Sequence, residues 1–144
     1  MERSNYCFVC GSDNLKLLHL EFTNIGKNTV ITEFKLEKEY EGDSVIIHGG
    51  VLAAILDNAM ANMVIINNIL IYAVELNVRY LKRCFVMENL QAKGWIEDVN
   101  RKIIETKSKI RSSNGELKVT AYGKYFIKNS FNFKDSKKIH HSID

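Results

Sequence analysis

Apolar and polar residues alternate along several stretches of the chain, and this pattern predicts β-strands with one apolar face. Alternation occurs in LKLLHLEF at residues 15–22 and in ITEFKLEK at residues 31–38, and TNIGKN between them predicts a hairpin. It occurs again in four later segments, AVELNVRYL, LQAKGWIEDV, KIIETKSKIR and ELKVTAYGKYFI. The last two are joined through Asn114-Gly115, a dipeptide typical of tight hairpins.

One segment departs from this alternation, because residues 50–66 are too long and too uniformly apolar for a strand. The polar positions between Val51 and Ile66 are Asp57, Asn58 and Asn62. A helix that is apolar nearly all round is buried. Two strands, one helix and four strands therefore predict an α+β architecture in which an antiparallel six-stranded sheet wraps around one long buried helix, the hotdog fold.

Length and composition predict one soluble domain, over residues 1–127 of 144, followed by a flexible tail at 128–144 that has no periodicity. The net charge of +3 argues against nucleic-acid binding. Asp and Asn residues interrupt the longest apolar stretch, which argues against a membrane span. Because the N-terminus lacks an apolar signal region, we expect a cytoplasmic protein whose three cysteines are reduced.

Asp57 is the unusual residue of the predicted helix, because a carboxylate in an apolar surround is costly unless it is compensated. The residues three and four positions away include Ala53, Ala54 and Ala61. These small side chains leave room for a ligand beside the acid. The alternative is a structural Asp57 bound to a backbone amide or an arginine.

A pair of glycines, Gly49 and Gly50, marks the start of this helix. The first turn of a helix has unpaired N–H groups and the positive end of the helix dipole, so it can hold a developing oxyanion. Glycine would also allow a substrate to approach the backbone closely. Alternatively, the glycines only allow a sharp turn into the helix, and both interpretations can hold together.

The spacing of these residues has a geometric consequence. Gly49 and Asp57 are eight residues apart, which corresponds to about 12 Å along one helix. An oxyanion donor and a nucleophile must each lie about 3 Å from the reacting carbonyl. We therefore expect two chains to share each site, in a homodimer or a dimer of dimers with sites at the subunit interface.

A second motif, Cys7-Phe8-Val9-Cys10-Gly11, allows several interpretations. A single CxxC can be half of a zinc site or a redox pair. The remaining candidates, Cys84, His19 and His140-His141, do not form a matching second pair of zinc ligands. We favour a packed N-terminal turn, and we expect no metal and no cofactor.

The segment HGGVLAAILDNAM, at residues 48–60, resembles the signature of hotdog-fold acyl-CoA thioesterases, in the branch that includes the phenylacetate-pathway enzymes. CFVCGSDNLKLLHLEF, YEGDSVIIHGG and ELNVRYLKR are also similar to segments of that family, as is the closing part from Trp95 to Phe126. The resemblance therefore extends over most of the chain.

The resemblance implies that Asp57 is the catalytic acid, acting as a nucleophile or as the base that activates water. It implies that the backbone N–H of Gly49 polarises the thioester carbonyl, and that the two residues come from different subunits. For His48, we favour a structural role in shaping the loop before the helix over a role in proton transfer. The residues expected to line the substrate site around the helix are His48, Gly50, Asn58 and Ala61.

Three basic residues after the helix, Arg79, Lys82 and Arg83, are expected to bind the phosphates of coenzyme A. The alternative is a solvated strand edge that discourages aggregation. The chain departs from its relatives at Gly42 and Ala73, where some of them carry a polar residue, and it lacks the proline that is common after the strand.

The predicted function is hydrolysis of a medium-chain or aromatic acyl-CoA to the free acid and CoA. The alternative is a hotdog protein that binds acyl-CoA or another acyl ligand without catalysis, because a fold does not fix a function.

Overall fold

The computed structural model describes residues 4–65 and 69–128. Its strands are β1 (Thr23–Asn24), β2 (Thr29–Phe34), β3 (Ile71–Tyr80), β4 (Leu90–Asn100), β5 (Ile103–Ser112) and β6 (Leu117–Ile127). Its helices are the 3₁₀-helix η1 (Lys38–Tyr40) and α1 (Gly49–Ile65). The predicted order of two strands, one helix and four strands is confirmed. The predicted tail lies, apart from Lys128, outside the described residues.

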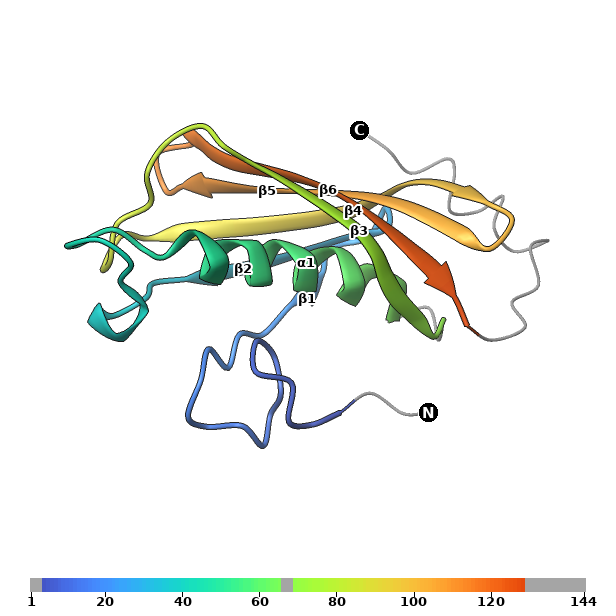
Figure 1. Cartoon of the computed structure of the whole chain (residues 1–144), viewed down its shortest axis with the longest axis horizontal. Coiled ribbons are helices and arrows are strands. Elements are labelled where there is room, and N and C mark those ends of the chain that lie inside the picture. Colours follow the sequence, from blue (N-terminus) through green and yellow to red (C-terminus); the bar gives the residue numbers. More distant parts are fainter. Residues whose placement is uncertain (1–3, 66–68, 129–144) are drawn as a thin grey trace.

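All six strands form one antiparallel sheet in the order β1-β2-β4-β5-β6-β3. The helix α1 runs along one face of this sheet (Figure 1). Gly115 has a φ of +91° in the turn between β5 and β6, which agrees with the hairpin predicted at Asn114-Gly115. The fold is α+β, with the single sheet and single long helix of the hotdog fold.

The helix packs closely on the middle of the sheet because Gly94 of β4 has no side chain. A Cβ atom at Gly94 would lie 2.5 Å from the carbonyl oxygen of Ala59, so only glycine fits there. The face of α1 towards the sheet is fully buried and consists of Leu52, Ile55, Leu56, Ala59, Met60 and Met63. Another face is only half-buried within one chain and includes Ala53, Ala54, Asp57 and Ala61.

The strand predicted at residues 15–22 is wrong, because the first strand of the sheet is only Thr23–Asn24. Leu18 and Leu20 are buried, as their alternation predicted. Their backbone amides, however, donate to the carbonyl oxygens of Phe8 and Val9, at 3.1 and 2.7 Å. This segment therefore pairs with the N-terminal turn, which lies on the side of α1 away from the sheet (Figure 1).

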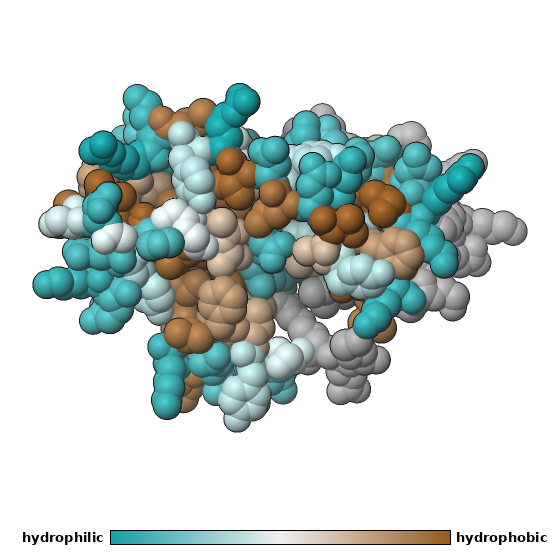
Figure 2. Space-filling model, viewed as in Figure 1, coloured by the Kyte–Doolittle hydropathy of each residue, from teal (hydrophilic) through white to brown (hydrophobic). Residues whose placement is uncertain are grey.

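The strand β3 forms one edge of the sheet, and within residues 4–65 and 69–128 it pairs with β6 alone. Its register shifts between Ala73 and Glu75, where Val74 interrupts the pairing. Its exposed apolar side chains are Tyr72, Val74, Leu76 and Tyr80. Figure 2 shows apolar surface next to polar surface on the face of the molecule that presents α1 and β3.

Within residues 4–65 and 69–128, no helix is long and apolar enough to cross a membrane.

Candidate active site

Asp57 lies near the middle of α1 and is held by a tyrosine of the sheet. The Tyr125 hydroxyl donates to Asp57 Oδ1 at 2.5 Å and lies 3.0 Å from the Asp57 carbonyl oxygen. Tyr125 belongs to β6 and is only 2% exposed. Among the described residues, no cation forms an ion pair with Asp57. The partner of the acid is therefore a neutral phenol and not the arginine that a purely structural role suggested.

The surroundings of Asp57 favour its protonated form. Burial raises the pKa of Asp57, and the hydrogen bond from Tyr125 opposes this rise without cancelling it. Burial and the neighbouring carboxylate raise the pKa of Tyr125, so its hydroxyl remains a donor at neutral pH. A carboxylate with a raised pKa is a stronger base than an exposed one, which suits proton transfer or attack on a carbonyl.

The start of α1 leaves one backbone donor unused. His48 Nδ1 lies 2.9 Å from the Gly50 amide nitrogen, and the His48 carbonyl accepts from Val51 and Leu52. Among residues 4–65 and 69–128, no acceptor contacts the N–H of Gly49. His48 therefore caps the helix, and the Gly49 amide is the free donor at its positive end.

Tyr80, at the end of β3, fixes the position of Gly49. Its hydroxyl donates to the Gly49 carbonyl oxygen at 2.6 Å. A Cβ atom at Gly49 would lie 3.3 Å from the Tyr80 ring, so a side chain there would crowd the tyrosine. Neither Tyr80 nor Tyr125 stands out in the sequence as a site residue, because each falls on an alternating strand where an aromatic residue is typical of the core.

Gly49 and two of the predicted phosphate-binding residues line the same pocket. This pocket has a volume of about 380 Å³. Its lining residues are Ile46, Ile47, Gly49, Leu52, Tyr80, Leu81, Lys82, Arg83 and Cys84. Arg79 does not line it, because the side chains of neighbouring strand residues point to opposite faces and Tyr80 points towards α1. Asp57 does not line it either.

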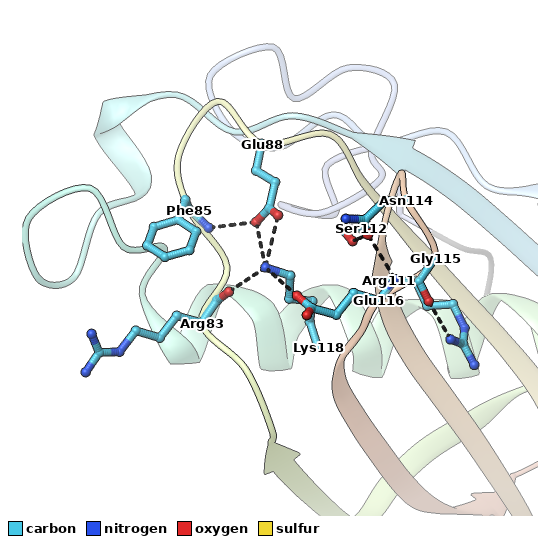
Figure 3. A network of polar contacts seen from close by, with 9 residues as sticks. All are labelled: Arg83, Phe85, Glu88, Arg111, Ser112, Asn114, Gly115, Glu116 and Lys118. Carbon is cyan, nitrogen blue, oxygen red and sulfur yellow. Dashed lines mark hydrogen bonds and ion pairs between the residues drawn. The ribbon is translucent and has the colours of Figure 1, made fainter.

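Lys118 holds the loop that carries Lys82 and Arg83. Its carbonyl oxygen accepts from the Leu81 and Lys82 amides at 2.9 Å each, and its Nζ donates to the Arg83 carbonyl oxygen at 2.9 Å. The same Nζ lies 3.0 Å from Glu88 Oε2. The guanidinium of Arg83 points away from this network (Figure 3). The loop is therefore fixed by its backbone, and the Arg83 side chain is left for other contacts.

The remaining predicted residues lie elsewhere on α1. Asn58 Nδ2 donates to Cys7 Sγ at 3.3 Å, so this side chain lies against the N-terminal turn. Asn62 is buried, and its amide lies 2.6 Å from Asn58 Oδ1. Ala61 is half-buried. The structure thus brings Gly49, Lys82 and Arg83 to one pocket, places His48 against the Gly50 amide, and places Asp57 further along the helix.

The fold and the glycine-started helix define a hotdog protein. The model of the Thioesterase superfamily matches residues 46–119, which include α1 and extend into β6. The chain belongs to this superfamily. No curated protein matches the chain by sequence.

Solved structures share this fold at low sequence identity. A thioesterase superfamily protein aligns with a TM-score of 0.80 and 23% identity over 86% of this chain and 61% of its own length. A hypothetical thioesterase of Streptococcus pneumoniae TIGR4, solved with coenzyme A, has a TM-score of 0.72 and 18% identity over 78% and 88% of the two chains. The E. coli PaaI protein, from the phenylacetic acid degradation operon, has a TM-score of 0.70 and 14% identity over 74% of this chain and 82% of its own. This chain thus spans less than two thirds of the first of these relatives.

Proposed function

We propose that this protein is an acyl-CoA thioesterase that hydrolyses a medium-chain or aromatic acyl-CoA to the free acid and CoA. The observation that carries this proposal is the pairing, on one helix, of a half-buried Asp57 with a raised pKa and a free Gly49 amide. Membership of the thioesterase superfamily supports it. The further assignment to the phenylacetate branch remains a prediction.

In the proposed site, Asp57 of one subunit acts with Gly49 of a second subunit. Both residues lie on the continuous helix α1, about 12 Å apart, so one chain does not bring them to the same carbonyl. The unpaired edge of β3, with its exposed Val74 and Leu76, is a suitable surface for a second copy. We infer a homodimer, or a dimer of dimers, with two equivalent sites at the interface.

The chemistry follows one of two routes. In the first, an Asp57 oxygen attacks the thioester carbonyl, the Gly49 N–H stabilises the oxyanion, the CoA thiolate leaves, and water hydrolyses the resulting anhydride. In the second, the Asp57 carboxylate removes a proton from water as that water attacks the same carbonyl. Repeated turnover in H₂¹⁸O identifies the first route when water attacks the anhydride at the Asp57 carbonyl carbon, because that attack places ¹⁸O in the Asp57 carboxylate and the second route does not.

The CoA phosphates are proposed to bind at the mouth of the Gly49 pocket. Lys82 and Arg83 line this pocket, and their positive charges can pair with the negative phosphates. The S. pneumoniae relative, solved with coenzyme A, supports a CoA ligand for this fold. The half-buried Ala53, Ala54 and Ala61 leave room for the acyl group beside Asp57.

The test is CoA release from a panel of acyl-CoA thioesters by the wild type and by Asp57→Asn. We expect release by the wild type and a loss of at least about a thousandfold in kcat for the variant, because asparagine neither attacks nor accepts a proton. The matched control is Asn77→Ala, on the exposed edge strand. Release by Asp57→Asn at the wild-type rate would overturn the proposal. Binding of CoA without turnover by the wild type would instead identify a binding protein.

The same variant has a predicted effect on stability. The raised pKa of Asp57 means that the folded state binds this proton more tightly than the unfolded state, so the acid destabilises the fold as pH rises through its folded pKa. Asparagine removes that charge and can still accept from Tyr125. We therefore expect the Tm of Asp57→Asn at neutral pH to be at or above that of the wild type, so lost activity is not lost folding.

A further inference from the structure

The N-terminal CxxC motif forms a fixed turn against α1. The Gly11 amide donates to the Cys7 carbonyl oxygen at 2.7 Å. A Cβ atom at Gly11 would lie 2.4 Å from the Asn5 carbonyl oxygen, so only glycine allows this tight turn. Val9, between the two cysteines, is 1% exposed and belongs to the core. The backbone of the motif is therefore held in place by the Gly11 turn and by the burial of Val9.

The two thiols of this turn lie beside each other and beside donors of α1. Cys7 Sγ accepts from Asn58 Nδ2 at 3.3 Å, and it is also hydrogen-bonded by the side chain of Cys10. Asn62 Nδ2 lies 4.0 Å from Cys10 Sγ. Both cysteines are partly exposed, so a reagent in solution can reach them.

The three cysteines differ in their electrostatic surroundings. Burial raises the pKa of Cys7, but hydrogen bonds from the backbone of Cys10 and Val9 and from the side chains of Cys10 and Asn58 outweigh it, so the pKa of Cys7 lies below its usual value. Cys84 is 1% exposed, and burial raises its pKa to about 11. The thiolate, which is the reactive form, is therefore favoured at Cys7 and disfavoured at Cys84.

The described residues do not complete a zinc site around this pair. Among residues 4–65 and 69–128, no group of three or more His, Cys, Asp or Glu side chains is placed to hold a metal. A structural zinc requires four ligands, and the turn provides two sulfurs.

We propose that Cys7 and Cys10 form a thiol–disulfide exchange site, with Cys7 as the attacking thiolate and Cys10 as the resolving thiol. The oxidant is a small-molecule disulfide. The Cys7 thiolate attacks one sulfur of that disulfide, forms a mixed disulfide and releases one small thiolate. Cys10 then loses its proton to solvent and attacks Cys7 Sγ, which forms the Cys7–Cys10 bond and releases the second small thiolate. The protein loses two electrons, and the small disulfide gains them. The chemistry proposed for this site does not rest on the proposed thioester hydrolysis.

The site is coupled to α1 through Asn58. Formation of the disulfide removes the thiolate that accepts from Asn58 Nδ2, and Asn58 is also hydrogen-bonded to Asn62 through its Oδ1 and carbonyl oxygens. Oxidation therefore weakens the contact between the N-terminal turn and the helix that carries Asp57.

The first test is equilibration of the full chain in glutathione disulfide, followed by acid quench, alkylation and peptide mass mapping. We expect Cys7 and Cys10 to be joined in one peptide that has lost two hydrogen atoms, with Cys84 alkylated. In Cys10→Ser, the mixed disulfide should persist on Cys7. The proposal is overturned if both thiols remain reduced in the wild type, or if the wild type accumulates the mixed disulfide as Cys10→Ser does.

The second test is the rate of alkylation by iodoacetamide as a function of pH, measured on the reduced protein. At about pH 7, Cys7 should react at least about tenfold faster than Cys84, because reaction follows the thiolate fraction and access. Asn58→Ala should slow Cys7 several-fold, while Asn77→Ala, its control on β3, should not. Equal rates for Cys7 and Cys84 in the folded protein would contradict the proposed role of Cys7.

Discussion

Two tyrosines hold the two ends of the candidate site, and they lie in opposite surroundings. Tyr125 binds Asp57 from β6 and is 2% exposed, whereas Tyr80 binds Gly49 from the end of β3 and is 51% exposed. The cause is sheet order, because β6 lies between β5 and β3 whereas β3 has one neighbour. Asp57 and Gly49 are both half-buried within one chain, but the tyrosine that holds Asp57 is buried whereas the tyrosine that holds Gly49 is exposed to solvent.

This difference separates two requirements of the proposed reaction. The pKa of Asp57 is set by burial and by Tyr125, both of which belong to the same chain. In the proposed dimer, by contrast, a second subunit brings the Gly49 amide to the acid and excludes water from it. We therefore expect variants near Gly49 and variants near Asp57 to change different properties of the protein, namely subunit association and the pH dependence of activity.

The largest effect is expected on the side of the site that includes Gly49, from a charged side chain introduced into the edge strand β3. Leu76 is exposed on β3 and faces the same side of the sheet as Val78 and Tyr80. In Leu76→Lys, the dimer should dissociate at least about a hundredfold more readily, because an unpaired charge is then buried at the interface. Sedimentation measures this, and activity should fall with it.

Asn77→Lys is the matched control, since Asn77 precedes Val78 on the opposite face of the same strand. It should leave the dimer intact. A Leu76→Lys protein that remains fully active as a monomer would contradict the shared site.

A smaller effect is expected at the buried end, from Tyr125→Phe. Without the hydroxyl, the Asp57 carboxylate loses the hydrogen bond that lowers its pKa, so this pKa should rise further. Activity at neutral pH should fall by about tenfold, and the acidic limb of the pH profile should move to higher pH. The dimer should be unaffected.

The control for that variant is Tyr122→Phe, which lies on the same strand but whose neighbours are Glu105 and Glu75. Its pH profile should match that of the wild type. An unchanged acidic limb in Tyr125→Phe would mean that Asp57 does not titrate in the rate-limiting step.

The smallest effect is expected from Tyr80→Phe. The ring that packs on Gly49 remains, and only the hydrogen bond to the Gly49 carbonyl oxygen is lost. We expect kcat to fall by about threefold, corresponding to the net worth of one neutral hydrogen bond, with the pH profile unchanged. Tyr72→Phe is the control, because Tyr72 stacks on Phe126 at the other end of β3. A shifted pH profile in Tyr80→Phe would show that the two ends are not independent.

Much of the fold could be predicted from periodicity alone. The helix and four of the strands fall where alternation or its absence placed them, with α1 starting at Gly49. The strand β2 ends at Phe34, before the end of the alternation that predicted a strand to Lys38. The segment around Leu18 and Leu20 was misassigned, because alternation reports only that one side is buried. It does not report whether the backbone pairs with a sheet or, as here, with Phe8 and Val9 of an N-terminal turn.

The candidate site was predicted only in part, for a related reason. Asp57 and Gly49 stood out because each breaks the local pattern, one as a charge in an apolar helix and one as half of a glycine pair. Tyr80 and Tyr125 fit the pattern of their strands and gave no signal. Their hydroxyls matter only because β3 and β6 carry them to α1.

The sequence by itself determined most of the elements and the buried helix with its acid, and it predicted a site shared by two chains from the spacing of Gly49 and Asp57, since these depend on local periodicity and helix rise. Only the tertiary structure decided what each group touches. It gave Asp57 a phenol as its partner, left the Gly49 amide free, and set the Cys7 thiol against Asn58. These contacts join residues distant in the chain, and no local pattern encodes them.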